Sequence, residues 1–210
     1  MKHVLLFFCL SVLTWTGSAQ TVATYFTQMP AELIPGVTVD TRKDLIDFYK
    51  NGKLSVMPAA FGGKVQLKTL ETDYLLLQTS DAANLQIKVL SLNDSSRILV
   101  LVHTVAGPLK DSRVKFYDTS WKPLKNISLP SFSVTDFIDS KKASSLGLSD
   151  RLNEIGPRLF VAIVFRPGEN VFVATSSLKA DLEKAQSETL GALIRDSVVY
   201  RWNNHTFQAE

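Results

Sequence analysis

Cysteine is nearly absent from this chain of 210 residues, which has a single one, Cys9. Cys9 follows Phe7 and Phe8 rather than the small residues that precede a lipid-attachment cysteine. One cysteine cannot form an internal disulfide, and it excludes a zinc site built from several cysteines. The fold must therefore be held by an apolar core, which a chain of this length can bury.

Histidine is also scarce, and of three in the chain His103 and His205 lie beyond residue 19. Neither a His-x-x-x-His nor an Asp-x-Asp spacing is present, so we predict no metal site and no cofactor. His103 lies in the apolar run RILVLVHTV (97–105). This position is typical of a histidine near the end of a strand rather than of a general base.

Common catalytic patterns are missing as well. A Ser-His-Asp triad would have to use His103, Asp111 and Ser112, but adjacent residues of a strand point to opposite faces. The Gly-x-Ser-x-Gly turn of serine hydrolases is absent from the sequence. A hydrolase that uses two carboxylates requires only that two acidic side chains converge in the fold. A small hydrolase of the cell envelope is therefore the alternative function.

Charge of one sign is not in large excess, because 23 lysines and arginines stand against 20 acidic residues. The charges are interspersed, and no basic stripe with interleaved aromatics is present, so nucleic acid is not an expected partner. Long apolar runs are missing too, apart from one at the N-terminus. We therefore expect no membrane span after that segment is removed.

Residues 1–19 have the pattern of a cleaved export signal. Lys2 gives a short positive start, 4–15 an apolar stretch, and Gly17-Ser18-Ala19 a small-residue cleavage site. We expect the exported chain to begin at Gln20 and to reside in the periplasm, at the cell surface or outside the cell.

Two amphipathic helices are predicted at the start of the exported chain. Apolar residues three and four positions apart predict the first over 21–29, ended by Pro30. Thr41 and Asp44 form a capping-box pattern that predicts the start of the second, and Asn51-Gly52 predicts its end.

The segment from Lys53 to Leu124 has short β-type runs separated by turn residues. These runs predict five or six strands joined as antiparallel hairpins. RILVLVHTV (97–105) is apolar on both faces and should be a central strand, whereas VQLKTL (65–70) alternates and should have one face in water.

The last third of the chain opens with a polar segment, SKKASSLGLSD (140–150), which we predict to be a surface loop or the end of a short helix. This segment is the candidate internal boundary. The sequence Arg166-Pro167-Gly168-Glu169 predicts a hairpin. Leucines and alanines predict a helix over 180–194, weakened at its end by Gly191.

Two stretches resemble each other, KDSRVKFYDTSW (110–121) and RDSVVYRWNNHTF (195–207). We interpret both as structural hairpins rather than a duplication, because their apolar rows are shifted by one residue. Their Asp-Ser pairs should then lie at strand starts and bond to backbone amides. The large aromatics should fill the core. Alternatively, Tyr117, Trp121 and Trp202 form a surface that stacks on a sugar or peptide.

Several segments, taken in order, resemble secreted proteins of Bacteroidetes known as domain-of-unknown-function family 3256. The segments are FGGK (61–64), TDYLLLQT (72–79), LND (92–94), TVAGPLKDS (104–112), FYDTSW (116–121) and YRW (200–202). The resemblance implies an exported protein of a Gram-negative bacterium. It implies no activity, ligand or catalytic residue.

The sequence as a whole predicts an α+β fold in which N-terminal helices pack on a mainly antiparallel sheet, followed by a C-terminal helix-and-hairpin portion. Residues 20–210 are expected to form a single domain, either as one unit or as two packed halves. The favoured function is a non-enzymatic exported protein that binds a protein or carbohydrate partner. The alternative remains the carboxylate-based hydrolase.

Overall fold

The structure is a computed structural model that describes residues 20–60 and 62–210. Over these residues the chain forms two antiparallel sheets, of six and four strands, together with short helices. The fold therefore belongs to the α+β class that the sequence predicts. The expected export signal, residues 1–19, lies outside the described part of the chain.

The large sheet is a meander in which each strand pairs with the next one along the chain. Its strands are β1 (Val56–Pro58), β2 (Lys64–Leu70), β3 (Tyr74–Ser80), β4 (Ala83–Ser91), β5 (Arg97–Ala106) and β6 (Lys110–Asp118). All of its pairs are antiparallel, as short turns between neighbouring strands require. The predicted strands and hairpins of this segment are confirmed.

Strand β5 is covered on both faces, as its apolar sequence predicts. Val100 and Val102 are buried on one face, and Leu99 and Leu101 are buried on the other. Strand β2 alternates instead between buried and more exposed residues at its start. The large sheet is therefore the middle layer of the molecule.

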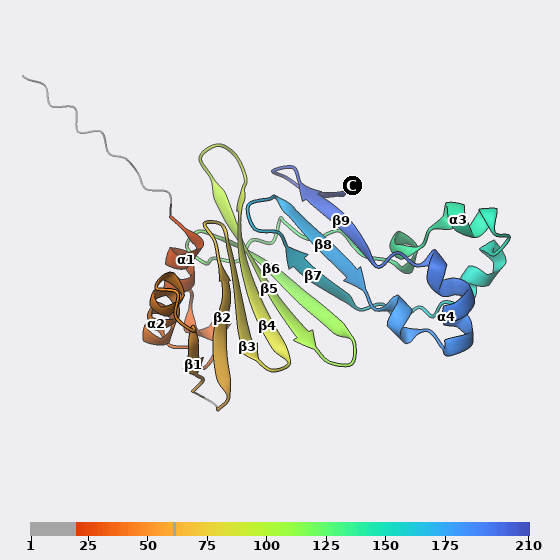
Figure 1. Ribbon diagram of the computed structural model, residues 1–210. Coiled ribbons are helices and arrows are strands. Elements are labelled where there is room, and N and C mark those ends of the chain that lie inside the picture. Colours follow the sequence, from red (N-terminus) through yellow and green to blue (C-terminus); the bar gives the residue numbers. More distant parts are fainter. Residues whose placement is uncertain (1–19, 61) are drawn as a thin grey trace, which may run out of the picture.

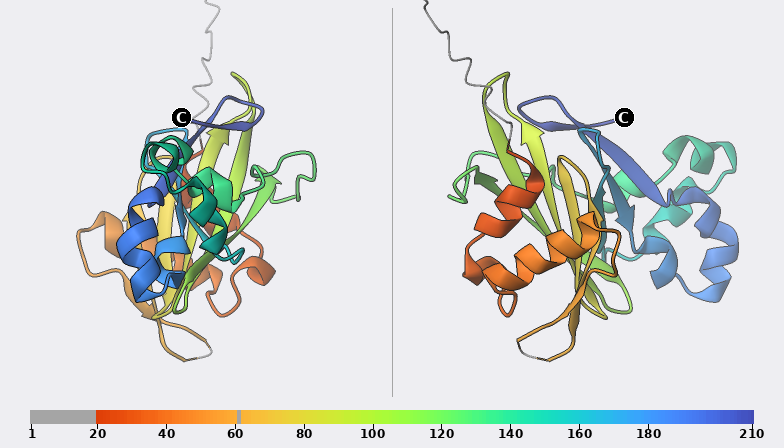
Figure 2. Two further views of the ribbon diagram at one scale, coloured as in Figure 1. Left: turned by 90° about the vertical axis from the view of Figure 1, so that its right-hand side faces the viewer. Right: turned by 60° about the vertical axis from the view of Figure 1, so that its left-hand side comes forward.

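Two helices form the layer on the Leu99 side of the large sheet (Figures 1 and 2). They are α1 (Val22–Gln28) and α2 (Val39–Lys50), and between them lies the 3-10 helix η1 (Ala31–Leu33). Helix α1 ends before Pro30, and α2 ends at Asn51-Gly52, where Gly52 has φ of 66°. Both predicted helix ends are confirmed.

The predicted start of α2 is wrong by about one turn. Thr38, rather than Thr41, is the N-cap, and its side-chain oxygen accepts a hydrogen bond from the backbone N–H of Thr41 at 3.1 Å. Thr38 has extended backbone angles, which an N-cap residue needs in order to reach the first turn. The helix therefore starts at Val39.

The buried Arg42 joins α2 to the end of α1. Its side chain is 1% exposed, and its Nη1 donates to the carbonyl oxygens of Phe26 at 2.9 Å and Met29 at 2.6 Å. Carbonyls at the C-terminal end of a helix lack a full set of intrahelical partners, and a positive charge is favourable there. Arg42 thereby fixes the angle between the two helices.

The chain leaves the large sheet through a long connection with three short helices, η2 (Val134–Phe137), α3 (Ser140–Ser145) and η3 (Ser149–Glu154). Helix α3 matches the short-helix alternative for residues 140–150. The single helix predicted over 180–194 is wrong. That segment is divided into η4 (Leu178–Asp181), α4 (Lys184–Leu190) and η5 (Gly191–Leu193). The break arises because Glu183 is the extended N-cap of α4 and forms a capping box with Gln186.

The small sheet packs on the opposite face of the large sheet from α1 and α2, and α3 and α4 lie beyond it (Figure 1). Its strand order is β10-β9-β8-β7. The strands are β7 (Val161–Phe165), β8 (Val171–Ser176), β9 (Ser197–Trp202) and β10 (Phe207–Ala209). The predicted hairpin around Gly168 is confirmed as the β7–β8 turn. Apolar side chains of both sheets share one core.

Polar side chains of the large sheet bond to the outer edge of β7. Gln86 is 1% exposed, accepts from the N–H of Phe165 at 3.1 Å and donates to the carbonyl of Ile163 at 2.8 Å. Ser112 accepts from the N–H of Ile163 at 2.9 Å. An unpaired strand edge is prone to pair with other chains, and here it is closed by the face of the large sheet.

Candidate functional site

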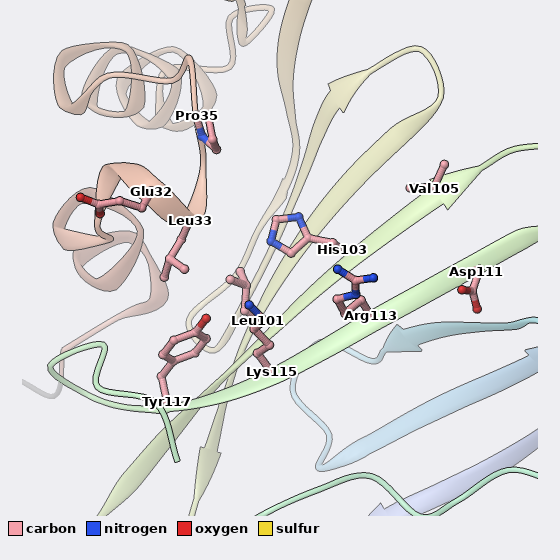
Figure 3. A pocket seen from close by; sticks show the side chains of 10 residues that line it. All are labelled: Glu32, Leu33, Pro35, Leu101, His103, Val105, Asp111, Arg113, Lys115 and Tyr117. Carbon is pink, nitrogen blue, oxygen red and sulfur yellow. The ribbon is translucent and has the colours of Figure 1, made fainter. Parts of the chain in front are cut away.

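A pocket of about 470 Å³ lies between η1 and the end of the large sheet formed by β5 and β6 (Figure 3). Leu33 and Pro35 line it from the helix layer, and side chains of the two strands line it from the sheet. Its volume is within the range of about 300–1,000 Å³ that is common for small-molecule sites. We take it as the candidate functional site.

Strand alternation brings the polar side chains of this pocket together. His103 of β5 is directly opposite Arg113 of β6, and Leu101 is opposite Lys115. Residues two apart on a strand share a face, so Tyr117 joins Arg113 and Lys115 on the pocket side. Figure 3 shows the side chains of this group on the same side of the two strands.

The carboxylates that line the pocket face away from it. The carboxylate of Glu32 points away from the strands in Figure 3. Asp111 is turned toward the small sheet, where its Oδ1 accepts from the backbone N–H of Val161 at 3.3 Å. The charged groups that project into the pocket are therefore the cations of Arg113 and Lys115.

The two titratable groups beside these cations are both shifted toward their neutral form. The pKa of His103 is lowered by burial, and further by the nearby charges of Lys115 and Arg113. Burial also raises the pKa of Tyr117. The imidazole is therefore neutral at neutral pH, and a bound anion would favour its protonation. Chemically, the pocket is suited to hold an anion and has the phenol of Tyr117 as a further hydrogen-bonding group.

The residues of the considered triad do not converge. Ser112 lies on the face toward the small sheet, where its Oγ is 2.8 Å from Oγ1 of Thr104 and bonds to β7. His103 is on the opposite face and beside Arg113. Ser112 and His103 therefore lie on opposite faces, so no nucleophile accompanies the histidine in this pocket. The carboxylate of Asp111 also turns toward β7, so the expected separation of Asp111 from Ser112 is not complete.

The three aromatic residues considered for ligand stacking lie in the core. The exposed fractions are 3% for Tyr117, 6% for Trp121 and 3% for Trp202. Tyr117 and Trp121 pack against each other with ring centroids 5.4 Å apart, and Tyr117 also borders the pocket. Trp202 lies in the core between the sheets, and its Nε1 donates to the carbonyl of Ser91 at 2.6 Å. The burial that the hairpin interpretation predicts for the tryptophans is confirmed.

The Asp-Ser pairs of the two similar stretches behave differently. Asp111 and Ser112 bond to backbone amides, although to those of β7 rather than to local ones. Asp196 forms an ion pair with Lys179 at 2.7 Å, and Ser197 is exposed at the start of β9. The expectation is therefore confirmed for the first pair only.

Within the described ranges, no three residues among His, Cys, Asp and Glu come close enough to hold a metal ion. In the same part of the chain, no helix is long and apolar enough to cross a membrane.

The chain is similar to proteins that are themselves uncharacterised. A family model described as "Protein of unknown function (DUF3256)" matches residues 15–207. The solved structure of a domain of an uncharacterized protein from Porphyromonas gingivalis W83 has the same fold, with a TM-score of 0.71 and 23% sequence identity. The match covers 92% of this chain and 99% of that one. No curated protein matches the chain.

Proposed function

The chain belongs to the family of proteins of unknown function DUF3256, as its sequence resemblance predicts, and on this premise we propose that it is an exported, non-enzymatic binding protein. Its ligand is anionic and occupies the pocket between η1 and strands β5 and β6. An acidic sugar of a surface glycan is the ligand class we favour. One observation carries the proposal. The cations of Arg113 and Lys115 both project into the pocket, whereas the carboxylates of Glu32 and Asp111 point away from it.

The chemistry of the pocket agrees with a carboxylate-bearing sugar. An arginine guanidinium binds a carboxylate through two parallel hydrogen bonds, and a lysine adds a point charge. Leu33 and Leu101 offer apolar contact for the ring carbons, and the Tyr117 hydroxyl offers a hydrogen bond. A carboxylate-based hydrolase would instead need acids directed at one substrate bond.

Export is part of the same proposal and rests on the pattern of residues 1–19. The protein would then meet its ligand in the periplasm or at the surface of a bacterium of the Bacteroidetes. Intact-mass analysis of the exported protein should find a chain that begins at Gln20. A chain that retains Met1, or one that carries lipid on Cys9, would contradict this.

Calorimetric titration with a trimer of galacturonic acid tests the proposed ligand class, with a neutral galactose trimer as the control. We expect the acidic trimer to bind and the neutral one not to bind. Affinity should fall between about 20 mM and about 200 mM salt, because exposed charges are screened. It should rise as the pH falls from about 7.5 to about 5.5, because a bound anion favours protonated His103.

Matched variants distinguish the pocket from the general charge of the protein. The double variant Arg113→Ala and Lys115→Ala should lose binding, whereas Lys141→Ala, which removes an exposed lysine on α3, should keep it. His103→Gln should bind with less dependence on pH. Equal affinity for the neutral trimer, or unchanged affinity in the double variant, would refute the proposal.

A further inference from the structure

Strand β6 is at the end of the large sheet, and part of its outer edge has no partner. Leu124 donates its N–H to the carbonyl of Phe116 at 2.9 Å, and Asp118 donates to the carbonyl of Lys122 at 2.9 Å. The backbone groups of residues 116 and 118 therefore point away from β5, and strand alternation places those of Ser112 and Val114 in the same direction. Among the described residues, the N–H groups of Ser112, Val114 and Phe116 have no hydrogen-bond partner.

The open edge of β6 contrasts with the closed edge of β7. Gln86 and Ser112 bond to the outward backbone groups of Ile163 and Phe165. No described side chain bonds in this way to the backbone of Val114. A backbone edge without partners can accept an added strand from another chain.

An apolar groove runs beside this open edge. Its volume is about 390 Å³, and its walls are β6 and the segment that follows it. Val114 lines it on one side, and Leu124, Ile127 and Leu129 line it on the other. These side chains are partly buried against the core between the two sheets. The groove therefore lies on the small-sheet face of β6 and offers space for apolar side chains of a neighbouring strand.

The opposite face of the same edge is positively charged. Arg113 and Lys115 are exposed there, and Lys122 and Lys125 are exposed close by in sequence. A second copy of β6 paired antiparallel about Val114 would place Arg113 opposite Lys115 of the other copy. Like charges directly opposite each other in a sheet are destabilising. The charge pattern therefore disfavours self-pairing and favours a strand with acidic residues.

We propose that the edge of β6 accepts an extended peptide segment of a partner protein as an additional antiparallel strand. Side chains of the peptide alternate between the two faces. Acidic side chains lie opposite Arg113 and Lys115, and apolar side chains between them enter the groove beside Val114. This site adjoins the glycan pocket and shares its cations Arg113 and Lys115, but the strand edge and the groove beside Val114 belong to the peptide site alone.

Antiparallel pairing determines which residues of the peptide form backbone hydrogen bonds to β6. Residues that exchange both hydrogen bonds have their side chains on the same face. Because Val114 has outward backbone groups and faces the groove, its bonded partner in the peptide must be an apolar residue. The N–H groups of the acidic residues must then point away from β6.

The test uses the soluble peptide Ac-Thr-Glu-Val-Glu-Val-Glu-Thr-NH2 and the purified exported protein in ¹H–¹⁵N NMR. Binding should shift the amide signals of Ser112 and Val114 and should slow their exchange with water, whereas Phe116 already faces Leu124 on this edge and should exchange as before. N-methylation of both valines should weaken binding by roughly tenfold or more, because it removes hydrogen bonds to β6. N-methylation of the central glutamate should have little effect, and replacing all glutamates by lysines should abolish binding.

The variant Val114→Pro tests the protein side, since an edge strand tolerates proline where the N–H faces outward. It should lose peptide binding by a similar factor while it binds the galacturonic acid trimer as before. If this variant does not fold, the proposal is still tested by the binding of the two kinds of N-methylated peptide to the wild-type protein. The proposal would be overturned if N-methylation of the central glutamate weakened binding as much as N-methylation of the two valines. Shifts confined to His103, Arg113 and the pocket would also overturn it and show that the peptide acts only as an anion there.

Discussion

Trp121 lies in the turn after β6 and has an unusual backbone conformation for a large side chain. Its φ is 63°, in the left-handed region that a residue with a Cβ atom occupies at a cost. Its ring is 6% exposed, packs against Tyr117, and donates from Nε1 to the carbonyl of Tyr25 at 3.1 Å. The buried ring therefore holds the backbone in this conformation and ties the turn to α1.

We predict an unusual order of stability for substitutions at this position. Trp121→Ala should destabilise the fold by about 3–5 kcal/mol, since it removes a buried ring and leaves a cavity. Trp121→Gly removes the same ring but has no Cβ atom, so it avoids the cost of the left-handed conformation. The glycine variant should therefore be more stable than the alanine variant by about 1 kcal/mol.

Urea unfolding followed by far-UV circular dichroism measures these differences when the slopes of the transitions agree. Trp202 provides the control, because it is 3% exposed in strand β9 and its φ is not positive. There the order should be reversed, with the alanine variant more stable than the glycine variant. If glycine is also the worse substitution at Trp121, the backbone carries no strain that the ring compensates. If Trp121→Ala is as stable as the wild type, the ring does not anchor the turn.

Three further predictions concern buried charges and pH. The ammonium of Lys88 is fully buried, 2.5 Å from the carboxylate of Asp73. Lys88→Ala should therefore lower the free energy of unfolding, measured in urea, by about 3–5 kcal/mol. Lys88→Met should lower it less, because the methionine side chain refills the space. Arg42→Met should cost about 3 kcal/mol, as it leaves carbonyls at the end of α1 without their donor; unchanged stability would show that water replaces the guanidinium. The lowered pKa of His103 means that the unfolded chain binds its proton more readily, so this residue's contribution to stability is present above about pH 6.5 and is lost as the pH falls through the folded-state pKa. Thermal unfolding of His103→Gln should show a smaller decrease in this range than the wild type.

Local patterns in the sequence predict much of the large sheet and its helices. The apolar run around Leu99 and Leu101 indicates a strand covered on both faces, and Asn51-Gly52 indicates the end of α2. These features depend on residues that are neighbours along the chain. The start of α2 is less predictable, because Thr38 and Thr41 are both suitable N-caps and the choice depends on where the preceding turn delivers the chain.

The candidate site is predictable only in part. Alternation along β6 places Arg113 and Lys115 on one face, and the short turn after β5 brings His103 beside them. The cover provided by Leu33 and the turning of Asp111 toward Val161 depend on contacts between distant parts of the chain. Periodicity carries no information on such contacts. The sequence therefore indicates that Arg113 and Lys115 share a strand face, but it does not identify them as site residues or predict the hollow that contains them.

The hydrogen bonds between the large sheet and β7 have a consequence for the order in which the parts of the protein fold. A chain is synthesised from its N-terminus, and its earlier parts can fold first. When the large sheet folds first, Gln86 and Ser112 are in place before β7 docks, and that strand then meets the donors and acceptors that its outer edge needs. A fragment that begins after β6 would present that edge bare. We expect such a fragment to associate with itself, while the same residues, added last to a finished sheet, do not.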